Sequence, residues 1–65
     1  MQLNENQLAE LEARCDRALN LPTAKRQLEF MGDWFNVDIN RLPPRAKLKF
    51  RRLLRSVSVN IFTVG

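Results

Sequence analysis

Several residue types that build active sites are scarce or missing in this chain of 65 residues. It has no histidine, no tyrosine and a single cysteine, Cys15. Without histidine there is no base of the kind that activates a catalytic serine or cysteine, and one cysteine can form neither an intrachain disulfide nor an ordinary zinc site. No glycine-rich phosphate loop is present. We therefore expect a protein that is not an enzyme and that binds no metal, cofactor or small-molecule substrate.

Long apolar runs and a targeting signal are missing as well. No stretch approaches the roughly 18 consecutive apolar residues that a membrane span requires. The N-terminus, MQLNENQ, lacks the positive charge and the apolar stretch of a secretion signal. A lone thiol without such a signal is typical of a reducing compartment. These features predict a soluble protein of the cytoplasm that makes no membrane contact.

The small size of the chain favours self-association. Folding a domain of this length buries only about 60% of the surface that the unfolded chain exposes. Domains this small usually gain stability from disulfides, a metal or oligomerisation. Because the first two are excluded by composition, we expect a homodimer.

Charge is divided unevenly along the chain. Residues 1–40 carry seven acidic and four basic residues, whereas residues 41–65 carry seven basic residues and no acidic one. A gradient of this kind favours an acidic or polyanionic partner, or pairing of the acidic half of one chain with the basic half of another.

Apolar residues at helical spacing predict a mainly α fold, in which residues 1–65 form one small domain of about three short amphipathic helices. The first helix is expected at about residues 5–20, because Asn4 and Gln7 have the spacing of a capping box. The second is expected at about residues 24–36, where Thr23 is the predicted cap and apolar residues occupy two neighbouring stripes. Gly32 is either a point of close approach for another helix or a point at which this helix bends or ends.

The third helix is expected at about residues 44–57, because two prolines suit the first turn of a helix. Beyond it the pattern is ambiguous. Val57, Val59 and Ile61 alternate with polar residues, which is the period of a strand, so residues 57–64 either form a strand or continue the helix. A strand here would pair with its own copy across a homodimer, since no second strand is visible in the chain.

Two groups of residues are candidates for binding. Large apolar side chains that serve as core or dimer anchors are Leu28, Phe30, Trp34, Phe35, Val59 and Ile61. Cations in two rows flank the apolar stripe of the third helix, and we predict that they contact a partner: Arg45, Lys47, Lys49, Arg51, Arg52 and Arg55.

Three interpretations of the basic helix remain open. It can bind an acidic protein surface, it can neutralise phosphates of a nucleic acid, or its cations can simply be solvated. No Asn or Gln lies within residues 43–55 to read adenine, so sequence-specific reading of DNA has little support. We favour a regulatory or accessory protein that acts by protein contacts, with nucleic acid as the alternative partner.

The chain as a whole resembles the short orphan helical proteins of lambdoid phage early regions. The segments MQLNENQLAELEARC and FMGDWFNVDINRLPP and the basic end carry this resemblance. It implies a host-directed or developmental regulator in the host cytoplasm, which acts by protein contacts as a homo-oligomer. Together with the charge gradient, this predicts an acidic host or phage protein as the partner. That group shares no site pattern, so the resemblance assigns no functional residues.

Overall fold

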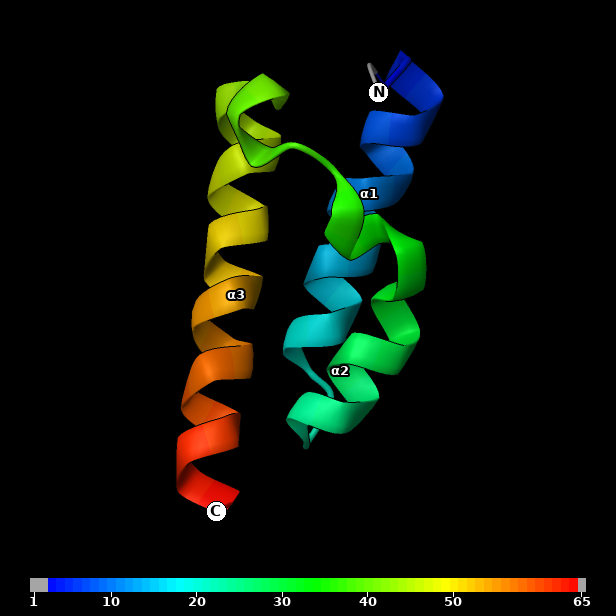
Figure 1. Ribbon diagram of the computed structural model, residues 1–65. Coiled ribbons are helices and arrows are strands. Elements are labelled where there is room, and N and C mark those ends of the chain that lie inside the picture. The colour runs from blue at the N-terminus through cyan, green and yellow to red at the C-terminus, as the bar shows by residue number, and fades with distance from the viewer. Residues whose placement is uncertain (1–2, 65) are drawn as a thin grey trace.

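The computed structural model describes residues 3–64, and the side chains of residues 3–62. It contains three α-helices, α1 (Glu5–Leu19), α2 (Ala24–Met31) and α3 (Pro44–Val64), and two 3-10 turns, η1 (Gly32–Asn36) and η2 (Ile39–Arg41). Figure 1 shows α3 running beside α1 and α2, with its C-terminal end extending past both. The mainly α fold with three helices is thus confirmed.

The capping box predicted at the start of α1 is present. The Asn4 side chain accepts a hydrogen bond from the Gln7 amide at 2.8 Å, and the Gln7 side chain accepts one from the Asn4 amide at 3.0 Å. Both interactions satisfy backbone donors that a helix start leaves without partners. The helix ends at Leu19, with Asn20 as its C-cap, which agrees with the predicted range of 5–20.

The second helix is shorter than the sequence predicted. Thr23 caps it as expected, but α2 ends at Met31 and the chain continues as η1, so a continuous helix over residues 24–36 is wrong. Gly32 has φ +52°, a backbone conformation that residues with a side chain rarely adopt. The glycine therefore ends the α-helix and lets η1 turn in a new direction.

The third helix is longer than predicted, and the alternative of a strand over residues 57–64 is wrong. α3 continues to Val64, and the described residues contain no strand. Tertiary contacts explain why the β-branched residues stay helical. Val57 is buried one turn beyond Leu53, and the side chains of Ser56 and Asn60 bond to Gln27 on α2. Such contacts outweigh the modest preference of valine and isoleucine for strands.

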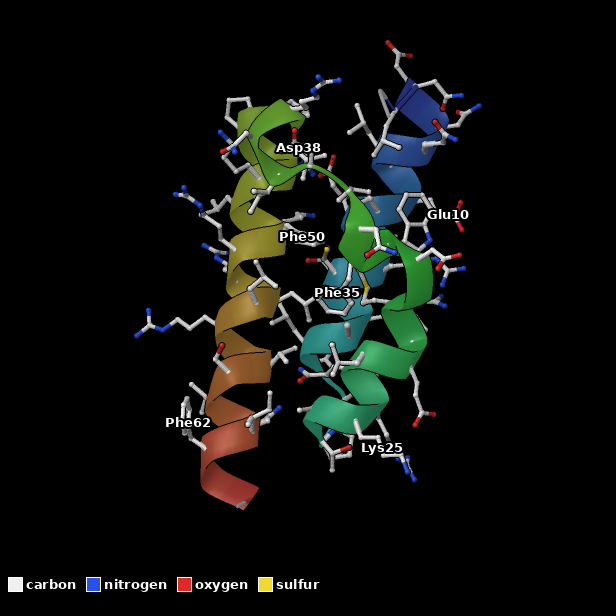
Figure 2. All side chains as sticks on the ribbon, in the orientation of Figure 1. Glu10, Lys25, Phe35, Asp38, Phe50 and Phe62 are labelled. Atoms are coloured by element: carbon white, nitrogen blue, oxygen red, sulfur yellow. The ribbon has the colours of Figure 1, made fainter. Side chains whose placement is uncertain are left out.

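One hydrophobic core joins the three helices. Figure 2 shows Phe35 and Phe50 between α3 and the other two helices, and their rings meet edge to face with centroids 5.8 Å apart. Of the predicted anchors, Phe30, Trp34 and Phe35 pack half-buried against this core, whereas Leu28, Val59 and Ile61 stay exposed. Both apolar stripes of the second segment are thus largely covered within one chain. The buried apolar residues are Leu11, Cys15, Ala18, Ala24, Met31, Leu42, Ala46, Phe50, Leu53 and Val57.

Gln27 is the buried polar residue at the centre of this packing. Its side-chain amide nitrogen donates to the Ala18 carbonyl and to the Ser56 hydroxyl, each at 3.0 Å. Its side-chain oxygen accepts a hydrogen bond from the Asn60 amide at 2.9 Å. One residue of α2 therefore bonds to the end of α1 and to two successive turns of α3.

The Gln27→Met variant tests this network, because methionine keeps the volume and removes every hydrogen bond. Leaving buried polar groups without partners costs about 1–3 kcal/mol, so we expect the free energy of unfolding in urea to fall by that amount. Glu29→Ala, an exposed change on the same helix, is the control and should stay within about 0.5 kcal/mol. Equal stability of the methionine variant would show that the hydrogen bonds contribute nothing.

Candidate functional site

The packing of α3 determines where its six predicted binding cations lie. Ala46, Phe50, Leu53 and Val57 turn one side of the helix toward the core. The cations therefore occupy the remaining circumference, and α3 has no acidic residue among them. The structure divides them into a pair that faces α1 and a group of four on the outer side.

The pair that faces α1 is neutralised within the chain. The Arg45 guanidinium lies 2.9 Å from a Glu12 carboxylate oxygen. The Lys49 ammonium lies 2.8 Å from Asp16 and 3.6 Å from Glu12. The hydrogen bond to Asp16 raises the pKa of Lys49. These two cations form ion pairs that bridge α1 and α3, which the sequence did not predict.

A surface hollow of about 370 Å³ lies at this contact, between α1 and α3. Its walls include Ala9 and Ala13 together with the four charged residues just described. Because those charges are paired with one another, the hollow offers little to a charged ligand. It is therefore not the candidate site.

The other four cations form what we call the cationic surface. It consists of Lys47, Arg51, Arg52 and Arg55, and none of them forms an ion pair among the residues that the structure describes. The three arginines are exposed, and Lys47 is half-buried. Leu48 lies among them, and 52% of its surface is exposed. Cations around an exposed leucine suit a ligand that is both anionic and partly apolar.

Two other cations of the chain, Arg14 and Arg41, are engaged locally. Arg14 lies 3.1 Å from Glu10, and its guanidinium stacks over the Phe30 ring at 5.5 Å. Arg41 lies 3.6 Å from Asp38. These contacts involve α1, α2 and η2. Arg17, Lys25 and Arg26 also form no ion pair among the described residues, but they are spread over two helices. The outer side of α3 therefore carries the greatest concentration of unpaired positive charge in the part of the chain that the structure describes.

Sequence reasoning missed two residues that matter. Gln27 was overlooked because no local pattern marks a glutamine whose partners lie nine to 33 residues away. Phe62, which is 84% exposed, was overlooked because a strand over residues 57–64 would place it opposite the apolar face. In a helix it instead joins other apolar side chains on the outer side of α3.

The described residues offer no site for a metal. No group of three or more acidic, cysteine or histidine side chains is arranged to hold an ion within residues 3–64. Across the same residues, no helix has both the length and the apolar character needed to cross a membrane. The cytoplasmic location stays a prediction.

Comparisons of the chain with family models, with curated proteins and with solved structures found no match. The resemblance to small phage proteins therefore stays a prediction. What the protein does must be inferred from the surfaces described above.

Cys15 provides a test of the hydrophobic core on which α3 packs. Its side chain is fully buried, and burial, with a smaller effect from Asp16, raises its pKa from 9.0 to about 11. The thiolate is the reactive form, so we expect almost no labelling by a thiol reagent at pH 8 in the native protein and rapid labelling in denaturant. Fast labelling without denaturant would contradict the buried position of the thiol.

Proposed function

We propose that this protein is a non-enzymatic regulatory or accessory protein, a homodimer that binds an acidic partner protein through the cationic surface of α3. One observation carries the proposal. Four cations that form no ion pair with any described residue surround an exposed leucine on the outer side of a single helix. A rigid helix with this surface can dock against a complementary groove or helix.

The exposed leucine favours a protein over a nucleic acid. Specific protein interfaces combine a small apolar centre with arginine, which is enriched at binding hot spots. Leu48 would supply the centre, and Arg51, Arg52 and Arg55 would surround it. A phosphate backbone satisfies the arginines but gives an exposed leucine no apolar partner.

The charge distribution supports an acidic partner. Glu12 and Asp16 neutralise Arg45 and Lys49, which face α1. The outer four cations have no acidic partner among the residues that the structure describes. Positive charge concentrated on one side speeds encounter with a negative surface and excludes basic competitors.

Nucleic acid is the second candidate, because α3 carries no acidic residue that would repel phosphate. Extending α3 to Val64 adds Asn60 to the helix, but its side-chain amide bonds to Gln27 on the side facing α2. The cationic surface itself thus still contains no Asn or Gln to read adenine. Any binding to DNA or RNA by this surface would be dominated by phosphate contacts.

The double variant Arg52→Glu/Arg55→Glu tests the protein interaction. A partner recovered from nuclease-treated lysate with the unaltered protein should bind this variant about tenfold or more weakly, a change of about 1.4 kcal/mol, because attraction becomes repulsion. The change is measured by titration calorimetry with the purified partner.

The matched control is Lys25→Glu/Arg26→Glu, which alters net charge equally at two exposed cations of α2. It should bind the partner nearly as well as the unaltered protein. If both variants bind equally well, the cationic surface is not the binding site.

A mobility-shift experiment tests the nucleic-acid alternative. Four phosphate contacts predict that affinity for duplex DNA or RNA falls about 100-fold between 50 and 200 mM salt. We expect no retardation even at 50 mM salt if the partner is a protein alone. Retardation with this salt dependence, lost in Arg52→Glu/Arg55→Glu, would instead support the alternative.

A further inference from the structure

Exposed apolar side chains gather on the C-terminal half of α3. Leu54 is 38% exposed, Val59 50%, Ile61 54% and Phe62 84%. No charged residue follows Arg55 in the sequence. This half of the helix therefore differs in character from the cationic surface on the preceding turns.

Three of these side chains share one sector of the helix. At about 100° per residue, Leu54, Ile61 and Phe62 fall within a sector about 100° wide, and Ser58 lies between them. Figure 2 shows Phe62 pointing away from α1 and α2. We call Leu54, Ser58, Ile61 and Phe62 the C-terminal apolar surface.

We propose that this surface binds the same surface of a second copy, with the two α3 helices antiparallel and crossing near Ser58. The inference rests on the homodimer of the proposed function and assigns its interface. A two-fold dimer requires a patch that is complementary to itself. An apolar surface with a small residue at its centre meets this requirement, because Ser58 lets the two helices approach closely.

The arginines decide the relative direction of the helices. Parallel helices would place each Arg51 and Arg55 beside its own copy. In the antiparallel arrangement the two Arg55 residues are about 9 Å apart along the axis and the two Arg51 residues about 21 Å apart. Both separations exceed the Debye length of about 8 Å at physiological ionic strength, so repulsion is largely screened.

Charge complementarity also favours a second copy. The last turn of α3 has no basic residue to interact with the negative end of the helix dipole. A crossing at Ser58 brings Arg51 of one copy to the last turn of α3 in the other. It also sets Leu54 of each copy opposite Phe62 of the second copy, so both apolar side chains lose contact with water.

Cysteine cross-linking tests the crossing point and the direction. The native thiol does not interfere, because Cys15 is fully buried. Under mild oxidation, Ser58→Cys should form a disulfide-linked dimer with high yield, whereas Arg51→Cys should not. Cross-linking of both variants would indicate parallel helices and overturn the proposal, as would absence of a cross-link in Ser58→Cys.

Sedimentation equilibrium tests the apolar contact. The unaltered protein should be a dimer at about 100 μM, and Phe62→Ser should raise the dimer dissociation constant about tenfold or more. Leu48→Ser, which removes an exposed leucine outside the surface, is the matched control and should leave the constant unchanged. The assignment would be overturned if Phe62→Ser had the same dimer dissociation constant as the unaltered protein. It would also be overturned if only Leu48→Ser weakened the dimer.

The remaining outcomes separate this interface from the proposed function. A monomer at about 100 μM that binds vesicles containing anionic lipid, and loses this binding with Phe62→Ser, would show that lipid covers the surface and would overturn the proposal. If the protein is a dimer but Ser58→Cys does not cross-link and Phe62→Ser does not weaken the dimer, the homodimer of the proposed function stands and this interface is wrong. The double variant Arg52→Glu/Arg55→Glu should still dimerise. A failure to bind the acidic partner can therefore be told apart from a failure to form the dimer.

Discussion

The buried Gln27 side chain is the point at which all three helices meet. Its hydrogen bonds to Ala18, Ser56 and Asn60 fix how α3 is rotated against α1 and α2. A buried amide is stable only when its partners are in place, so a different rotation of α3 would leave polar groups without partners. The core supplies most of the stabilising burial, but this network selects one arrangement of it.

Both candidate surfaces follow from that arrangement. With Ser56 and Asn60 directed at Gln27 and Val57 buried, Arg52 and Arg55 must point outward, and so must Phe62. One helix thus carries two successive exposed regions, first cationic and then apolar. Charges and apolar groups that are separated along a single helix allow one chain to use different surfaces for different partners.

The pairing between α1 and α3 limits which cations are available. Glu12 and Asp16 engage Arg45 and Lys49, so the acidic first half of the chain neutralises part of its own basic second half. Ion pairs at the surface, including partly exposed ones such as these, add little stability. Their larger effect concerns α3, where the cations that form no ion pair with any described residue all lie on the side that faces away from α1.

The sequence by itself determined the features that depend on neighbouring residues. The cap at Asn4 and the buried face of α3 were predictable because capping spacing and helical periodicity are local signals. The length of α3 and the exposure of Phe62 were not predictable from the sequence. Valine and isoleucine alternating with polar residues are compatible with a strand as well as a helix, and only contacts with Gln27 and the core decide between the two. The neutralisation of Arg45 and Lys49 likewise required the tertiary structure, since their partners lie more than 30 residues away in the sequence.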